Sequence, residues 1–287
     1  MDLPGIALRF ALFVDLLLLV GIAGYAGWRH PVARLPWIVA MLAIVGMLLS
    51  VAGLVVLAAG MAGTGIGDVD RATLEMVVTA TAVGRSWVVR IVALCVAVAL
   101  AARPRLAALA GAVALATLAW SGHGAMDEGV IGRVHLVADI VHLLAAALWI
   151  GVLALLCALL VRVPDPSRLA RTHRLASGFA GLGTVLVVAI VASGIVNAWL
   201  LVGGFGGLTG TLYGRLLLVK LMLFAAMLCL AALNRFRLTP ALALPTGDPA
   251  SAWRGLRASV AVETGCGIAI LALVAWLGTL APPVAGL

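Results

Sequence analysis

The chain has 287 residues, of which 64% are hydrophobic and only 10% are charged, and its formal net charge is +8. This composition excludes an ordinary soluble domain, because about a quarter of the residues of such domains are charged. Apolar runs of about 20 residues cross a bilayer as helices, since open strands would leave backbone groups unsatisfied in lipid. The sequence therefore predicts an all-α polytopic membrane protein.

Eight apolar runs are long enough to span a bilayer at about 1.5 Å of rise per residue. In chain order they cover residues 5–28, 36–60, 86–102, 106–125, 134–160, 174–201, 212–234 and 256–280. The first run has no basic segment before it and no cleavage site of small residues after it. We therefore expect a retained helix rather than a signal peptide.

The connection between the second and third runs, residues 61–85, is long enough to hold an element of its own. We predict a short helix from Val69 to Val83, with Asp68 as its N-cap, because Asp is a favoured residue at that position. A lid over one mouth of the bundle is the functional alternative, and a plain connector is the interpretation we favour.

The basic residues indicate how the helices are oriented. Most of the 19 Lys and Arg residues lie in the connections after the first, third, fifth and seventh runs: Arg29, Arg34, Arg103, Arg105, Arg162, Arg168, Arg171, Arg174, Arg235, Arg237, Arg254 and Arg257. By the positive-inside rule these connections are cytoplasmic, so both termini are expected outside. The net positive charge follows from this topology and does not indicate nucleic-acid binding.

Two parts of the chain read alike. Residues 81–90 and 211–220 both start with Thr, carry Gly-Arg at their fourth and fifth positions and end on a basic residue. At one constant offset the chain also repeats the pairs Gly5 and Gly129, Arg9 and Arg133, Asp15 and Asp139, and Gly27 and Gly151. We therefore predict two parallel four-helix repeats, residues 1–125 and residues 126–287.

A cluster of histidines marks the beginning of the second repeat. His123, His135 and His142 are three of the five histidines, and Asp139 lies between the last two. The spacing i, i+4, i+7 places His135, Asp139 and His142 on one stripe of a helix. We expect His135 at the outer surface and His142 roughly 10 Å deeper. The first repeat has no histidine at the equivalent positions, so the predicted site is asymmetric.

The cluster has the chemistry of a copper site. Imidazole and thioether ligands suit copper, and Met126 is close in sequence to His123. Asp139 is better suited to accept a hydrogen bond from a histidine N–H, which orients the ring. The alternative is that these histidines only form hydrogen bonds between helices.

Ionisable residues inside the predicted helices are expected to face the bundle interior and to pair with one another, because bare charges in hydrocarbon are costly. These residues are Arg9, Asp15, Arg90, Asp139, Lys220 and Glu263. A permeation path or proton relay is the functional alternative, with Glu263 as its innermost step. We expect Asn197 to bridge helices.

Four segments carry a resemblance to a known family. They are residues 121–124 (SGHG), 142–151 (HLLAAALWIG), 211–220 (TLYGRLLLVK) and 231–240 (AALNRFRLTP). With them the chain resembles the CopD/PcoD family of bacterial inner-membrane copper proteins. The resemblance implies copper movement between periplasm and cytoplasm, with import as the favoured direction. With the orientation given by the basic residues, both termini are then expected in the periplasm. It also implies a periplasmic copper-binding partner similar to CopC.

We accordingly expect a copper-binding protein in the bacterial inner (plasma) membrane, with His123, Met126, His135, Asp139 and His142 as its metal-site residues. It is expected not to be an enzyme, because the sequence has no nucleotide-binding P-loop and no phosphorylation motif of the ion-pumping ATPases. The first rival is a b-type haem redox protein with histidine axial ligands. The second is a scaffolding protein that binds no metal.

Overall fold

The computed structural model describes residues 3–29, 34–122, 129–243 and 249–283. Within them the regular elements are all helical, and eight helices are long and apolar enough to cross a membrane, which confirms the predicted fold class and number of spans. The elements are α1 (Leu3–Arg29), α2 (Leu35–Ala62), η1 (Ile66–Asp68), α3 (Arg71–Ala80), α4 (Ala82–Ala99), α5 (Pro104–Ala116), η2 (Thr117–Ser121), α6 (Gly129–Leu160), α7 (Pro166–Val202), α8 (Phe205–Gly210), α9 (Leu212–Leu233), the π-helical turn η4 (Asn234–Leu238), α10 (Thr239–Ala241) and α11 (Pro249–Leu277).

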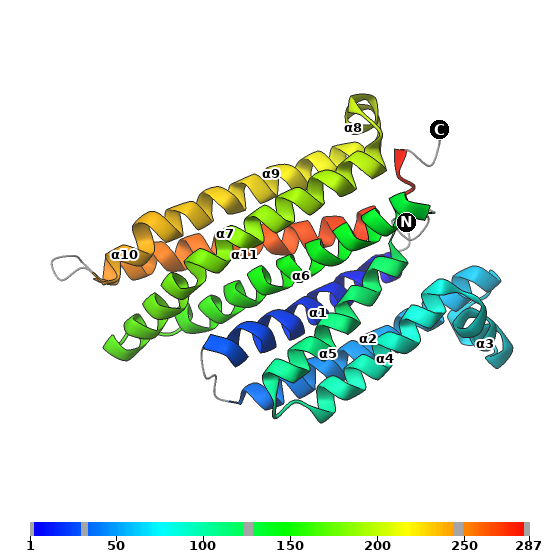
Figure 1. Ribbon diagram of the computed structural model, residues 1–287, viewed down its shortest axis with the longest axis horizontal. Coiled ribbons are helices and arrows are strands. Elements are labelled where there is room, and N and C mark those ends of the chain that lie inside the picture. Colours follow the sequence, from blue (N-terminus) through cyan, green and yellow to red (C-terminus); the bar gives the residue numbers. More distant parts are fainter. Residues whose placement is uncertain (1–2, 30–33, 123–128, 244–248, 284–287) are drawn as a thin grey trace.

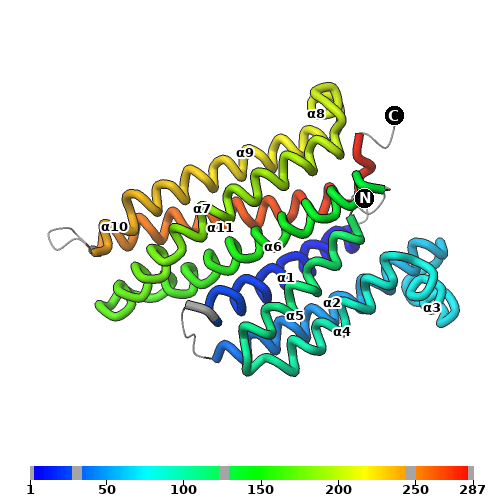
Figure 2. The backbone as a smooth tube through the Cα atoms, viewed as in Figure 1, coloured from blue at the N-terminus to red at the C-terminus, as the bar shows by residue number. Residues whose placement is uncertain are grey.

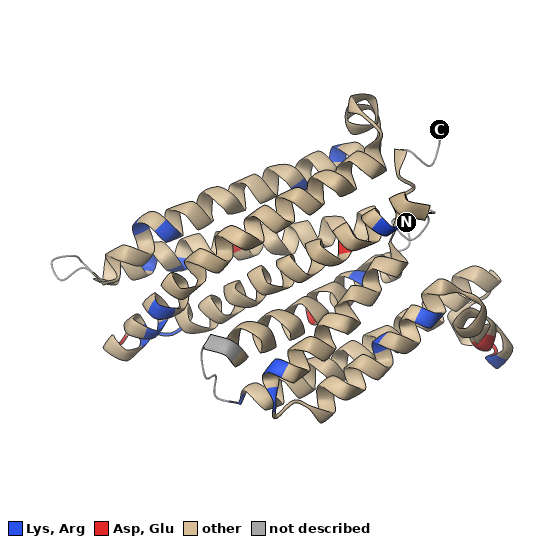
Figure 3. Ribbon diagram, viewed as in Figure 1, with Lys and Arg blue, Asp and Glu red and all other residues tan. Residues whose placement is uncertain are grey.

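Helix α1 lies in the middle of the molecule, where it packs against α2, α5, α6 and α11 (Figure 1). We call residues 3–122 the first half and residues 129–283 the second half. Helix α1 begins and α11 ends at the same end of the molecule, which we call the terminal end (Figure 1). Basic residues gather at the opposite end, where α7 begins and α9 ends, and this is the basic end (Figure 3). Which side of the membrane each end faces remains a prediction.

The two halves meet at a close crossing of α1 and α6. A Cβ atom added to Gly21 would lie 1.9 Å from the carbonyl oxygen of Ala147, and one added to Gly151 would lie 2.2 Å from the carbonyl carbon of Gly21. Helix backbones approach this closely only where the side chains are absent, as at other glycine contacts between membrane helices. The halves are therefore joined by backbone contact.

Helices α4 and α9 begin in the same way. The hydroxyl of Thr81 accepts a hydrogen bond from the amide of Gly84 at 2.9 Å, and that of Thr211 accepts one from Gly214 at 3.0 Å. Each hydroxyl also donates to a carbonyl of the preceding short helix, at 2.7 Å for Thr81 and 2.6 Å for Thr211. This shared geometry supports the predicted duplication locally, while superposition of the complete units remains a prediction.

The helices of the two halves close differently. In the first half α1 and α4 each pack against both α2 and α5, so the four form a ring. In the second half α6 packs against α7 and α11, and α9 packs against α11. Helices α7 and α9, which overlap in the view of Figure 2, have little direct contact with one another.

The predicted helix over Val69 to Val83 is shorter than expected, and its predicted N-cap is wrong. Helix α3 is capped by Asp70, whose carboxylate accepts the amide of Thr73 at 2.8 Å. It stops before Thr81 because that residue takes an extended conformation and caps α4. A cluster of Val77 with two residues of α2 attaches α3 to that helix, which favours a connector.

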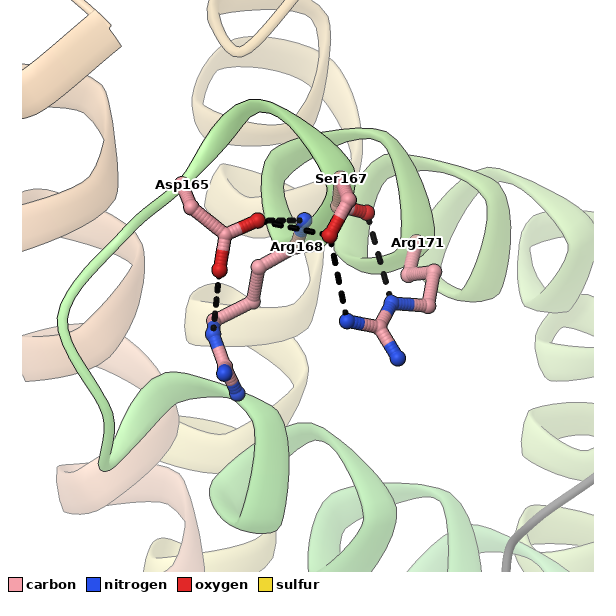
Figure 4. Close-up of polar contacts among 4 residues, drawn as sticks. All are labelled: Asp165, Ser167, Arg168 and Arg171. Atoms are coloured by element: carbon pink, nitrogen blue, oxygen red, sulfur yellow. Dashed lines mark hydrogen bonds and ion pairs between the residues drawn. The ribbon is translucent and has the colours of Figure 1, made fainter.

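The basic end of α7 is fixed by a network around Asp165 (Figure 4). The carboxylate of Asp165 accepts the hydroxyl of Ser167 at 2.6 Å and the amide of Arg168 at 2.9 Å. These hydrogen bonds favour the ionised form and hold the pKa of Asp165 below its ordinary value. Arg171 donates to the carbonyl and hydroxyl of Ser167, which adds a second connection within the first turn.

The expected ion pairs among the six ionisable residues within the membrane helices are not found. Within the described residues, ion pairs occur at Arg71 with Glu75 and at Arg168 with Asp165, both near the surface. Arg90 is buried but donates to the hydroxyl of Thr117 at 2.7 Å. Neutral hydroxyl and amide groups are the partners of Arg90, Asp139 and Glu263. A neutral partner satisfies a buried charged group without burying a second charge.

Candidate functional site

A cavity of about 420 Å³ lies in the second half, between α6, α7, α9 and α11, with α1 and η2 completing its wall. We call it the histidine cavity. Most of its lining is apolar, as is usual for ligand sites. Its polar and ionisable lining residues are Arg9, His135, Asp139, His142, Asn197, Tyr213 and Lys220. The cavity lies between α7 and α9, which have little direct contact with one another.

Three predicted site residues line this cavity together: His135, Asp139 and His142. All three are on α6, as their spacing indicates. His135 is buried, with only 1% of the residue exposed. Its predicted position near the outer surface of the membrane remains a prediction.

His142 is held in a defined orientation by α7. Its Nδ1 lies 3.0 Å from the hydroxyl oxygen of Ser193, and the Ser193 hydroxyl donates its proton to the carbonyl of Ala189 at 2.6 Å. A hydroxyl has one proton, and with that proton on the Ala189 carbonyl the Ser193 oxygen accepts from His142 in the tautomer that carries hydrogen on Nδ1. In this tautomer Nε2 is the basic nitrogen of His142, and a hydrogen-bond partner at the other ring nitrogen is typical of metal-ligating histidines.

Asp139 is bound to α7 as well. Its Oδ1 accepts a hydrogen bond from the side-chain amide of Asn197 at 2.6 Å. His135 and Lys220 lie close enough to Asp139 to interact with it electrostatically. Asn197 therefore bridges helices, as predicted, and also contributes to the cavity wall. The carboxylate places negative charge beside the Lys220 ammonium group in a setting that is otherwise apolar.

Two other predicted site residues, His123 and Met126, lie outside the described residues. Among the described residues, no three His, Cys, Asp or Glu side chains are grouped so that they form a metal site by themselves. The histidine cavity therefore offers two imidazoles and a carboxylate along one wall. A complete ligand set from this region requires His123 or Met126 in addition.

The site contains residues that the sequence did not point to. Ser193 and Tyr213 gave no signal of their own, because single hydroxyl groups in apolar helices have many structural uses. Arg9 and Lys220 were recognised as charges within the membrane, but nothing placed them beside the histidines. Only packing of α1 and α9 against the same space brings them there.

The fold and the cavity define a polytopic helical membrane protein with a buried, partly ionisable binding space. Comparison with known proteins gives its family. The model described as "Copper resistance protein D-like, N-terminal domain" matches residues 1–133, and "Copper resistance protein D" matches residues 173–277. Copper resistance protein D of Pseudomonas syringae pv. tomato is 41% identical over an alignment of 303 residues, and the alignment covers 98% of this chain and 97% of that protein. The chain therefore belongs to the copper resistance protein D family.

Two further relatives extend the comparison. Inner membrane protein YebZ of Escherichia coli (strain K12) is 30% identical over 288 residues, which cover 96% of this chain and 98% of that protein. Copper transport protein CutJ of Bacillus subtilis (strain 168) is 35% identical over 120 residues, which cover 40% of this chain and 21% of that protein. No solved structure matches the chain. The comparisons confirm the family that the sequence motifs predict.

Proposed function

We propose that this protein binds copper in the bacterial inner membrane and moves copper ions between periplasm and cytoplasm, with import as the favoured direction. The family supports a role in copper handling. The names of two relatives, an inner membrane protein and a copper transport protein, support the location and the activity. Eight spanning helices around a buried cavity are suited to passage of an ion.

The observation that carries this proposal is the setting of His142. Its Nδ1 is engaged with Ser193, which leaves Nε2 as a lone-pair donor in the wall of the histidine cavity. Neutral imidazole is a ligand that copper accepts readily. We propose that His135 and His142 bind the ion with His123 and Met126, and that Asp139 assists.

Asp139 also has an electrostatic role in the proposal. Lys220 faces the same cavity, and its ammonium form opposes entry of a cation. The carboxylate of Asp139 offsets that charge, because opposite charges interact strongly where water is scarce. Copper entry therefore depends on Asp139 even where the metal is bound through imidazole nitrogen.

The passage that we propose includes no covalent step, so the protein acts as a carrier or channel rather than an enzyme. With the basic end cytoplasmic, both termini and the mouth near η2 face the periplasm. A periplasmic protein similar to CopC is the proposed copper donor at that mouth. Ligand exchange between the donor and the histidines would load the cavity.

Copper uptake by reconstituted lipid vesicles tests the proposed function. Wild type is expected to admit copper, and Asp139→Asn is expected to lower the rate at least about tenfold. The matched control is Asp15→Asn, a buried carboxylate of α1 that does not line the histidine cavity. Wild-type vesicles that take up no more copper than protein-free vesicles would contradict the proposal. A haem Soret absorption band in the purified protein would instead support the redox alternative.

A further inference from the structure

A second cavity, of about 260 Å³, lies toward the basic end of the second half. We call it the glutamate cavity. Its polar lining residues are Thr184 of α7, Asn234 and Arg235 of η4, Thr239 of α10 and Glu263 of α11, together with the indole of Trp149. Both cavities lie between α7 and α9, and Trp149 of α6 lines each of them.

Aromatic rings separate the two cavities. The ring of Trp149 meets Phe179 of α7 edge to face, with centroids 6.3 Å apart, and lies 6.4 Å from the ring of Phe224 of α9. An ion leaving the histidine cavity toward the basic end therefore meets Trp149 first. Glu263 is the carboxylate on the other side of this barrier.

Glu263 is buried, with 3% exposed, and both of its carboxylate oxygens accept hydrogen bonds. Trp149 donates its indole N–H to Oε1 at 3.0 Å, and Asn234 donates its side-chain amide to Oε2 at 3.0 Å. The barrier residue and the carboxylate are thus linked directly. A change in the charge of Glu263 alters the hydrogen bond that orients Trp149.

Asn234 can serve both protonation states of Glu263. Its Oδ1 is buried and has no hydrogen-bond partner among the described residues, so rotation of the amide breaks no hydrogen bond at that oxygen. With NH₂ toward Glu263 the amide donates to a carboxylate, and with Oδ1 toward it the amide accepts from a carboxylic acid. Asn234 also begins the π-helical turn η4, a geometry found frequently at functional sites.

The other titratable or charged groups near Glu263 have partners of their own. Arg235 of η4 donates to the hydroxyl of Thr184 at 2.6 Å, and Tyr25 of α1 donates to the carbonyl of Leu175 at 3.1 Å. Cys157 of α6 lies 3.2 Å from the hydroxyl of Thr264. The lining residues from α7 and α9 are neutral. Within the described lining, Glu263 is therefore the group suited to take up and release a proton.

We propose that Glu263 is a proton-exchange site that couples copper passage to the movement of a proton. This inference rests on the proposed function and names its driving ion. A hydronium ion at the basic end breaks one of its O–H bonds and leaves as water, an O–H bond forms at Oε2 of Glu263, and the Asn234 amide rotates so that its Oδ1 accepts a hydrogen bond from this new hydroxyl. Breaking the same O–H bond transfers the proton to a water molecule and restores the carboxylate. Buried carboxylates serve such relays in other membrane transporters.

Infrared spectroscopy of the purified full-length protein tests the proton site without copper. Difference spectra between acidic and alkaline pH should contain the C=O band of a protonated carboxyl group that is absent from Glu263→Gln and retained in Asp15→Asn. Asn234→Leu should shift this band without removing it, because the hydrogen-bond partner changes and the acid remains. Identical difference spectra for wild type and Glu263→Gln would overturn the proposal.

Vesicle uptake under an imposed pH difference tests the coupling. The rate of copper uptake should respond to the pH difference in wild type and in Asp15→Asn, and should not respond in Glu263→Gln. A Glu263→Gln protein that responds as wild type does would overturn the coupling while leaving copper transport intact. Absence of uptake in wild type would contradict the proposed function instead, and the infrared experiment still decides whether Glu263 exchanges a proton. Glu263→Asp, which keeps the acid, distinguishes loss of proton exchange from loss of folding.

Discussion

Helices α4 and α9 begin with the same cap in the two halves of the molecule, but the helices of the first half form a closed ring and those of the second half do not. In the first half the indole of Trp87 on α4 donates to the carbonyl of Ser50 on α2 at 2.8 Å, within a closed ring of helices. In the second half the corresponding helices, α9 and α7, stand apart, and the histidine and glutamate cavities lie between them. Arg235 of η4 bonds to Thr184 of α7 across the gap at the basic end.

The difference indicates which half of the bundle is suited to bind a ligand. A closed ring buries its polar groups against neutral partners, as Arg90 does with Thr117. An opened ring instead lines a space with groups that can accept a ligand, such as His142 and Glu263. Among the described residues, the histidines that line a cavity, His135 and His142, belong to the second half.

The largest expected effect comes from breaking the contact between the halves. Gly151→Val should destabilise the protein by about 3 kcal/mol or more, since its Cβ would overlap the backbone of α1, which cannot move aside. Thermal unfolding in detergent measures the effect. Gly60→Ala is the matched control, because a Cβ there has no atom within 4 Å. Equal unfolding temperatures for the two variants would show that α1 and α6 do not cross as described.

The next prediction sharpens the role of α7 in the histidine cavity. Ser193→Ala removes the acceptor that fixes the His142 ring, so copper affinity should fall by about 10- to 100-fold. Titration of the purified protein with copper measures this. Ser177→Ala is the control, because the Ser177 hydroxyl bonds to a carbonyl of the same helix at the exposed surface. Unchanged affinity in Ser193→Ala would show that His142 needs no support from α7.

The duplicated helix starts make a smaller, paired prediction. Thr81→Ala and Thr211→Ala should each cost about 1 kcal/mol of stability, because each removes an N-cap. The two losses should be similar if the halves are repeats. Thr209→Ala, which removes an exposed hydroxyl that caps no helix, should change the unfolding temperature little. A loss of stability in only one of the two variants would argue against the prediction that the halves are repeats.

The smallest effect concerns pH at the basic end. Hydrogen bonds from Ser167 and Arg168 lower the pKa of Asp165 in the folded protein, so its contribution to stability is present above the pKa of the unfolded chain. That contribution is lost as pH falls through the folded pKa. The protection of the Arg168 amide, meaning its exchange rate compared with the intrinsic rate at the same pH, should therefore fall in acid. Asp165→Asn should remove this dependence, and an unchanged pH profile would contradict the capping role.

Much of the fold could be predicted from the sequence, because each span is a local apolar run. The common wall formed by His135, Asp139 and His142 also follows from local spacing on one helix. The gap between α7 and α9 could not be predicted. A helix face that contacts lipid is as apolar as one that packs against another helix. The composition of α7 and α9 therefore does not show whether these helices touch.

The partners of the site residues were hidden for a different reason. Ser193 and Asn197 reach α6 from α7, and Trp149 bonds to Glu263 from more than 100 residues away in the chain. Such pairs depend on which helices become neighbours and how each is rotated. A single sequence contains no periodicity that specifies either property.

Copper binding by purified variants tests the central claim most directly. Metal analysis after copper loading should show bound copper in wild type and in His173→Ala, a histidine of α7 that lines neither cavity. His142→Ala should lose most of that copper, because the account makes its Nε2 a metal ligand in the wall of the histidine cavity. Equal copper content in wild type, His142→Ala and His173→Ala would contradict the account and make the histidines of α6 structural.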